Sequence, residues 1–411
     1  MKAVLLAAGE GVRMRPLTST RSKHMIFLAG KPVLEHCLLS LNEAGFKEAL
    51  VVVGYKGELI KQYFGNGSKF GMRLNYIEQE KVLGTANAIQ LAEDYVEDEP
   101  FLATYGDLLI TPRAIRLLLS KHKAGAAATI GIVPVSQTEQ YGTVKLKDDK
   151  IVSIIEKPKF GAAPSNLANA GIYLFTSEIF SRIKRTKHSP RREFEITDSI
   201  RLLIEDGLPV TAAEIHPDDW MDIGRPWDLL EANKRVLQRA TLRIRGEVEA
   251  GAHLVGPVGL GVNARVRSGA YIEGAVFIDG DSDIGPNCYI RPYTSIGKRV
   301  RIGNGCEIKN SIVMDGTHIG HLSYVGDSVV GSNCNFGAGT ITANLRLDDK
   351  SVKVVVKNKL IDSGLRKLGV FVGDNVKTGI NVSFMPGVKV GPNTWIEPNI
   401  SVYKDLYQTR M

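Results

Sequence analysis

An aliphatic residue recurs every six positions through much of the second half of the chain. Eleven consecutive positions of this series are Val, Leu or Ile: Val248, Leu254, Leu260, Val266, Ile272, Ile278, Ile284, Ile290, Ile296, Ile302 and Ile308. A six-residue period is typical of a parallel β-helix, in which each hexad supplies one short strand and one turn. The aliphatic side chains then point into the interior, and three hexads complete one triangular coil.

The series is interrupted in two places. It slips by one residue near Ile312 and Val313, and it breaks roughly from 341 to 370. It then returns at Val372, Thr378, Phe384, Val390, Ile396 and Val402. Glycine often follows the aliphatic residue, as at Gly285, Gly297, Gly303, Gly320, Gly373 and Gly391. We expect these glycines to supply positive φ at the turns. Because an insertion into a solenoid costs ordering entropy, the long break predicts a functional segment.

The first half has a different organisation, in which short β-rich runs alternate with amphipathic helical patterns. The predicted strands are 3–6, 49–53, 74–77, 101–104, 128–133, 151–155 and 171–175, and the predicted helices include 32–44, 85–95 and 111–121. This alternation predicts an α/β, Rossmann-like domain with a mostly parallel sheet covered on both faces. We place the domains at 1–240 and 241–411, with a linking helix around 226–239.

Composition limits the classes of partner. The formal charge is +8, but Lys and Arg are dispersed, so we expect anion-binding clefts for phosphorylated substrates rather than a nucleic-acid surface. No apolar stretch reaches the length of a membrane span, and the apolar N-terminus meets Glu10 too early for a signal peptide. The cysteines lack metal-ligand spacing and predict a reducing, cytoplasmic location: Cys37, Cys288, Cys306 and Cys334.

A glycine-containing loop follows the first predicted strand. Gly9 and Gly11 are followed by Arg13, Arg15 and Lys23. Backbone N–H groups of such a loop can approach a phosphate, and three cations close by suit a triphosphate whose diphosphate must be neutralised as it leaves. The alternative is a glycine turn with surface basic residues.

The motifs LAAGEGVRMRPLT, SK and GKPVLEH resemble those of nucleotidyltransferases that join a nucleoside triphosphate to a sugar 1-phosphate, and QEKVLGTANAI, TYGDLLI, YGTV, IIEKP, ANAGIY and WMDIGRPWD extend the resemblance along the first half. The resemblance implies that Arg13 and Lys23 are catalytic and that Asp107 and Asp222 hold Mg²⁺. It implies nucleotide binding by Leu6, Ala8, Gly9, Gly11, Gln79, Gly84, Thr85 and Asp107, and sugar-phosphate binding by Gly142, Glu156, Lys157 and Asn169. Ser22 stands where many members have proline, so UTP and dTTP both stay open.

The stretch GHLSYVGD, residues 320–327, places His321 and Tyr324 outside the interior phase of the repeat. Taken alone, His321 would be a hydrogen-bonded corner residue. With NFGAGTITAN and the RP pair at 291–292, the stretch resembles the acetyltransferase half of the bifunctional enzyme that makes UDP-N-acetylglucosamine. Archaeal bifunctional sugar-1-phosphate nucleotidylyltransferase/acetyltransferases are still more similar, over essentially the entire chain.

This second resemblance implies a left-handed β-helix, a homotrimer and acetyl-CoA as the acetyl donor. His321 would be the base that removes a proton from the amine, since imidazole titrates near neutral pH. The other acetyltransferase substrate-binding residues would be Arg291, Lys309, Tyr324, Asn335, Asn344, Lys350 and Lys353.

The predicted function is N-acetylation of glucosamine 1-phosphate, or galactosamine 1-phosphate, followed by uridylyl transfer from UTP to N-acetylglucosamine 1-phosphate with release of diphosphate. One alternative is a single-activity nucleotidyltransferase, of the glucose 1-phosphate or GDP-mannose type, with a structural β-helix. A non-catalytic regulator, as in some translation-initiation exchange factors, is disfavoured because Arg13, Lys23, Asp107 and Asp222 are all present.

Overall fold

The computed structural model describes residues 1–407 and divides into two compact units. The first unit comprises Met1–Glu10 and Val33–Asp222, and the second comprises Gly11–Pro32 and the chain from Ile223 onward. The second unit therefore includes a segment from the N-terminal motif region. The boundary expected between 240 and 241 stays a prediction.

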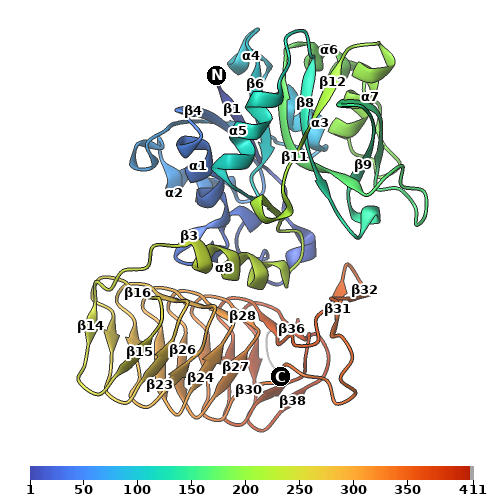
Figure 1. Ribbon diagram of the computed structural model, residues 1–411. Helices are drawn as coiled ribbons and strands as arrows, with labels where there is room; N and C mark the ends of the chain where they lie inside the picture. Colours follow the sequence, from blue (N-terminus) through green and yellow to red (C-terminus); the bar gives the residue numbers. More distant parts are fainter. Residues whose placement is uncertain (408–411) are drawn as a thin grey trace. The chain divides into compact units, whose positions relative to one another are not determined.

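The first unit is built on one mixed sheet with the strand order β5-β4-β1-β6-β11-β8-β12-β10-β9 (Figure 1). The strands are β1 (Ala3–Ala7), β4 (Glu48–Val53), β5 (Arg73–Glu78), β6 (Phe101–Tyr105), β8 (Ala128–Pro134), β9 (Gly142–Lys147), β10 (Lys150–Glu156), β11 (Leu167–Phe175) and β12 (Val210–Glu214). Each of the predicted strands is present. Every residue of β1 is buried, as expected for a central strand covered on both faces.

The sheet is less parallel than the sequence predicted. Strand β1 pairs parallel with β4 and β6, but β11 runs antiparallel to both β6 and β8, and β10 runs antiparallel to β9 and β12. The apolar run of β11 showed a buried strand, but burial carries no information about direction. Strands β9 and β12 were missed, since the polar alternation of β9 and the two alanines of β12 gave weak signals.

Two groups of helices pack in this unit. Helices α1 (Val33–Glu43) and α5 (Pro112–Lys121) contact each other, and α7 (Ile196–Glu205) contacts α6 (Glu178–Arg185) and α3 (Thr85–Gln90). The predicted N-terminus of α5 is confirmed, because the Thr111 hydroxyl accepts a hydrogen bond from the Ala114 N–H at 3.3 Å. The helix predicted over 85–95 is two helices, α3 and α4 (Glu93–Val96).

The second unit is the predicted β-helix. In the part of the chain that the structure describes, its short strands stack as three parallel sheets (Figure 1). The first sheet is β14 (Glu247–Val248), β17 (Arg265–Val266), β20 (Asp283–Ile284), β23 (Arg301–Asn304), β26 (His318–His321), β29 (Asn335–Phe336), β34 (Lys377–Thr378) and β37 (Trp395–Ile396). The second is β15 (His253–Val255), β18 (Tyr271–Glu273), β21 (Tyr289–Ile290), β24 (Glu307–Lys309), β27 (Tyr324–Gly326), β30 (Ile341–Thr342), β35 (Ser383–Phe384) and β38 (Ser401–Val402), and the third is β16 (Val258–Leu260), β19 (Val276–Ile278), β22 (Thr294–Ile296), β25 (Ile312–Val313), β28 (Val329–Val330), β33 (Phe371–Val372) and β36 (Lys389–Val390). Apolar side chains of the repeat form one continuous buried cluster along the stack. Helix α8 (Asp228–Arg239) confirms the expected linking helix.

The glycines of the repeat do not act as predicted. Of the six named above, only Gly285 has positive φ, at 101°. The left-handed corner conformation belongs instead to Asn and Asp residues, such as Asn375 at 60° and Asn393 at 59°, and to other glycines, such as Gly316 at 70°. Glycine is required by close stacking: a Cβ on Gly303 would lie 1.8 Å from the carbonyl oxygen of Gly320 in the next coil. The Asn375 amide also donates to Asn393 across one coil at 3.0 Å.

The break in the repeat is an antiparallel hairpin of β31 (Lys353–Val356) and β32 (Lys359–Asp362). It protrudes from the coils in Figure 1. Strand β28 (Val329–Val330) pairs directly with β33 (Phe371–Val372), so the stack continues past the insertion. Among residues 1–407, none of the helices has the length and apolar character needed to cross a bilayer.

Candidate active sites

The N-terminal motif forms a tightly folded loop. Gly11 has φ of 73°, and a Cβ at this position would lie 3.0 Å from Cβ of Lys23. The Thr18 hydroxyl donates to the Gly11 carbonyl at 3.0 Å. Lys23 begins a 3₁₀ turn, Lys23–Met25, that the Ser22 side chain caps. Gly11 therefore makes room for the aliphatic part of the Lys23 side chain.

The chain is buried where β1 ends and the expected phosphate loop begins. Leu6 and Ala8 are buried, and the Ala8 carbonyl accepts from the Tyr55 N–H at 2.9 Å. A Cβ on Gly9 would meet no atom within 4 Å, so the backbone is open at this position.

A two-stranded sheet of the first unit places Asp222 opposite the residue that follows Asp107. Strand β7 (Leu108–Ile110) pairs antiparallel with β13 (Trp220–Asp222), and Asp222 lies opposite Leu108, the residue that follows Asp107. Asp107 is buried and lies near Cys37, whose pKa is raised to about 12 by burial and, to a smaller extent, by the Asp107 charge. Carboxylates suit Mg²⁺, which is typically held by one or two of them together with substrate phosphates. Within residues 1–407, no three His, Cys, Asp or Glu side chains group as a metal site.

The segment expected to recognise the base is anchored at its centre. Gln79 is buried and donates to the Gly84 carbonyl at 3.2 Å and to Asn87 Oδ1 at 2.8 Å. Gly84 has φ of 120°, and the Thr85 hydroxyl accepts from the Ile196 N–H at 3.0 Å. These contacts fix the loop that precedes α3 against the start of α7.

Residues of the expected sugar-phosphate side converge around Glu156. Gly142 lies opposite Glu156 in the β9–β10 pair, and a Cβ on Gly142 would lie 2.9 Å from Glu156 Oε2 and 3.6 Å from the Cβ of Asn169. Lys157 follows with φ of 42°, and its Nζ lies 3.7 Å from Glu156 Oε1.

Two residues here were missed by the sequence analysis. Arg191 Nη2 lies 2.9 Å from Glu156 Oε1, and the Thr197 hydroxyl donates to Glu156 Oε2 at 3.2 Å. The basic pair in RREFEITD, a few residues before the buried Glu195, was the available signal. Asn169 donates to the Tyr173 hydroxyl at 2.7 Å, and burial raises the pKa of Tyr173, so that phenol stays neutral.

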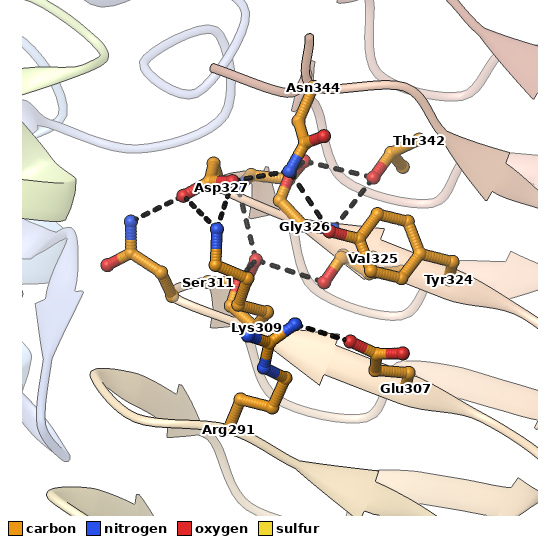
Figure 2. A network of polar contacts seen from close by, with 12 residues as sticks. Arg291, Glu307, Lys309, Ser311, Tyr324, Val325, Gly326, Asp327, Thr342 and Asn344 are labelled. Atoms are coloured by element: carbon orange, nitrogen blue, oxygen red, sulfur yellow. Dashed lines mark hydrogen bonds and ion pairs between the residues drawn. The ribbon is translucent and has the colours of Figure 1, made fainter. Parts of the chain in front are cut away.

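In the second unit, Asp327 is the centre of a polar network on one outer face of the β-helix (Figure 2). Its carboxylate lies 3.0 Å from Lys309 Nζ and accepts from the amides of Asn344 at 2.5 Å and Asn310 at 2.8 Å. The Asn344 amide also donates to the Tyr324 hydroxyl at 3.0 Å. The structure thus unites three predicted residues, Lys309, Tyr324 and Asn344, around a carboxylate that was not predicted.

Asp327 was missed although it lies inside the quoted GHLSYVGD stretch. It has φ of 50°, which is the corner conformation of this β-helix, so a reading of the repeat assigns it only a structural role. Its side chain is 5% exposed, and a buried carboxylate needs a cationic or hydrogen-bonding partner. The pKa of Tyr324 is raised by burial and by the Asp327 charge, so this phenol remains a hydrogen-bond donor.

Arg291 lies beside the network on the same face. Its Nη1 is 2.8 Å from Glu307 Oε1. Strand β24 (Glu307–Lys309) pairs with β27 (Tyr324–Gly326), and this pairing places Glu307 opposite Tyr324. Glu307 holds the pKa of Arg291 above its usual value. The Arg291 guanidinium and the Lys309 ammonium therefore lie on one face of the β-helix (Figure 2), and such cations can bind an anionic group of a substrate.

His321 ends β26 (His318–His321) at a corner, where its side chain is exposed. The imidazole is therefore at the surface and not packed into the core. Asn335 pairs with His318 rather than His321, so within one chain it lies about 10 Å from the histidine along the strand. Lys350 and Lys353 are exposed on the insertion. These residues lie outside the Asp327 network of a single chain.

Comparison with known proteins covers both units. The nucleotidyl transferase family model matches residues 2–239, and the model of the GMPPB C-terminal domain matches residues 272–362. The bifunctional protein GlmU of Methanocaldococcus jannaschii is 46% identical over 411 residues, which cover 99% of this chain and 96% of that protein. The chain belongs to the bifunctional GlmU family.

Two further proteins are similar to this GlmU-family chain. The bifunctional sugar-1-phosphate nucleotidylyltransferase/acetyltransferase of Sulfurisphaera tokodaii is 42% identical over 411 residues, 99% of this chain and 98% of that protein. A UDP-glucose pyrophosphorylase solved with UDP-glucose has a TM-score of 0.53 and 26% identity, and covers 58% of this chain and 99% of its own. The predicted family and the fold class, α/β Rossmann-like followed by a left-handed β-helix, are confirmed.

Proposed function

We propose that this chain N-acetylates glucosamine 1-phosphate with acetyl-CoA and joins N-acetylglucosamine 1-phosphate to UTP with release of diphosphate. The observation that carries the proposal is identity over the full length to proteins named as bifunctional GlmU, together with the polar network around Asp327 on the β-helix. A β-helix with only a scaffolding role has no need of this network.

In nucleotidyl transfer, the sugar phosphate attacks the α-phosphorus of the nucleotide and diphosphate leaves. Both reactants are anions, so the reaction depends on positioning and on neutralisation of charge. Arg13 and Lys23 stabilise the diphosphate. Asp107 and Asp222 would hold Mg²⁺, which would supply further positive charge to the phosphate groups. The contact of Asp222 with the strand that follows Asp107 supports this assignment.

Binding in this reaction is divided between two sets of residues. Leu6, Ala8, Gly9 and Gly11, from the end of β1 and the loop that follows it, bind the nucleotide. The segment with Gln79, Gly84 and Thr85 receives the base. The set around Gly142, with Glu156, Lys157 and Asn169, receives the sugar and its phosphate, and the convergence on Glu156 supports it. UTP and dTTP remain the two candidate nucleotides.

In acetyl transfer, His321 accepts a proton from the amine as the amine attacks the thioester of acetyl-CoA, and coenzyme A leaves as the thiol. Arg291, Lys309 and Tyr324 bind the sugar phosphate, while Asn335 and Asn344 orient the amino sugar. Lys350 and Lys353 bind phosphate groups of the sugar or of coenzyme A.

Assembly as a homotrimer is part of the proposal. Asn335 and the lysines of the insertion lie outside the Asp327 network of one chain, and a neighbouring chain would complete the site. A cytoplasmic location is also proposed, since the four cysteines, all within residues 1–407, are free and buried.

Two assays test the proposal. Thiol release from acetyl-CoA is measured with glucosamine 1-phosphate and galactosamine 1-phosphate, and diphosphate release is measured with UTP, dTTP, ATP and GTP. Activity in both assays is expected. Absence of thiol release with every hexosamine 1-phosphate would reduce the function to nucleotidyl transfer alone, and absence of both activities would overturn the proposal.

A further inference from the structure

The N-terminal loop that carries Arg13 and Lys23 is fastened to the β-helix. Segment 11–32 belongs to the second unit, and a hydrogen bond, a packing contact and an ion pair are among the contacts that attach it there. The Ala29 N–H donates to Asn233 Oδ1 of α8 at 3.3 Å, and Gly30 packs on Phe277, since a Cβ would lie 2.5 Å from the Phe277 ring. The third contact is an ion pair between Arg21 and Asp374 of the β-helix, 2.5 Å from Arg21 Nη2 to Asp374 Oδ2.

The two oxygens of Asp374 have separate tasks. Oδ1 accepts from the backbone N–H of Ser332 at 2.8 Å, which closes a corner between two coils. Oδ2 faces the loop and accepts from Arg21 Nη2 and from the Thr20 hydroxyl, each at 2.5 Å. Arg21 also donates to the Ser332 hydroxyl at 3.0 Å. The first oxygen serves the β-helix, and the second serves only the loop.

The ion pair is well placed to control Lys23. The side chains of Arg21 and Asp374 are 15% and 12% exposed, so water screens their attraction only weakly. Arg21 is followed by Ser22, which caps the turn that begins at Lys23. The Lys23 side chain then packs on Gly11. Asp374 of the β-helix therefore contacts Arg21, which lies two residues before Lys23.

We propose that Arg21 and Asp374 form a clamp by which the β-helix positions the catalytic loop for nucleotidyl transfer. The clamp rests on the role of Lys23 in the proposed function. It makes the second half of the chain a positioning element of the first reaction, in addition to its own reaction. Displacement of a charged group by about 1 Å can cost on the order of 10²-fold in rate, so the clamp has a measurable effect.

The test uses the full chain with Asp374→Asn, Arg21→Ala and the double variant. Asparagine retains the oxygen that the Ser332 N–H requires but loses the acceptor and the charge that hold Arg21. We expect kcat for diphosphate release to fall roughly 10- to 100-fold in each variant, with little change in KM. The double variant should lose less than the two single variants added together, because both of them remove the Arg21–Asp374 ion pair. Amide hydrogen exchange in 11–25 should become faster.

Asp315→Asn is the matched control. Asp315 Oδ1 accepts from the Lys298 N–H at 2.9 Å in the same kind of corner, and within residues 1–407 it takes part in no ion pair. Thiol release should stay near the wild-type value in all variants. Unchanged kcat, additive losses in the double variant, or an equal fall in thiol release would overturn the clamp. If the wild-type protein releases no diphosphate with any triphosphate, nucleotidyl transfer itself is refuted, and the clamp with it.

Discussion

Replacing Asp327 by asparagine should impair acetyl transfer and spare nucleotidyl transfer. The Asp327 carboxylate, 5% exposed, binds the Lys309 ammonium at 3.0 Å and accepts from the Asn344 amide at 2.5 Å. Asparagine keeps the shape but removes the charge and turns one acceptor into a donor. A hydrogen bond to a charged group contributes about 1.5–3 kcal/mol, and we take about 2 kcal/mol because Lys309 is 19% exposed and can turn towards water.

A loss of about 2 kcal/mol corresponds to roughly 30-fold. We therefore expect kcat/KM for thiol release with glucosamine 1-phosphate to fall roughly 30-fold in Asp327→Asn, while diphosphate release keeps its rate. Asp315→Asn serves again as the control, since that carboxylate closes a corner without an ion pair within residues 1–407. Full thiol release in Asp327→Asn, or the same loss in Asp315→Asn, would refute the reasoning that Asp327 holds Lys309 and Asn344 in place.

Three further predictions concern single residues. His321→Ala should lower thiol release on the order of 10²–10⁴-fold and leave diphosphate release intact, and equal loss of both would contradict independent sites. Asp222→Asn should raise the Mg²⁺ concentration needed for half-maximal diphosphate release without affecting thiol release. Gly303→Ala should destabilise the protein by about 1–3 kcal/mol or more, read as a lower Tm, because its Cβ would lie 1.8 Å from the Gly320 carbonyl. Gly320→Ala is the control, since a Cβ there meets nothing within 4 Å.

The sequence predicted the β-helix well because every coil presents the same demand, an apolar side chain in the interior. The predicted role of the repeat glycines, to supply positive φ at the turns, was wrong for all of the named positions except Gly285. A repeat written on one line shows which residue follows which, but it does not show that Gly303 lies against Gly320 of the next coil. The need for positive φ moved to residues such as Asn375, whose short polar side chain tolerates that conformation.

The candidate sites were predicted only in part, because contacts between neighbouring coils and distant segments are not visible in the sequence. Lys309, Tyr324 and Asn344 were chosen by resemblance, and the structure brings them together. Asp327 was missed because a corner aspartate looks structural until its neighbours in adjacent coils are known. The approach of Asp222 to the strand after Asp107 depends on a pairing between distant segments, which neither composition nor spacing reveals.

The hairpin β31–β32 leaves the register of the stack undisturbed, since Val330 pairs with Val372 as though the intervening residues were absent. Its exposed residues can therefore change without a shift of the coils on either side, whereas Val352 and Val354 are buried and lie against Gly387 of the β-helix. A relative could exchange the lysines of this hairpin for other side chains and alter which acceptor it recognises, while the machinery that holds the acetyl-transfer residues stays as it is. Relatives that accept different acceptor sugars should accordingly differ in the sequence of this hairpin.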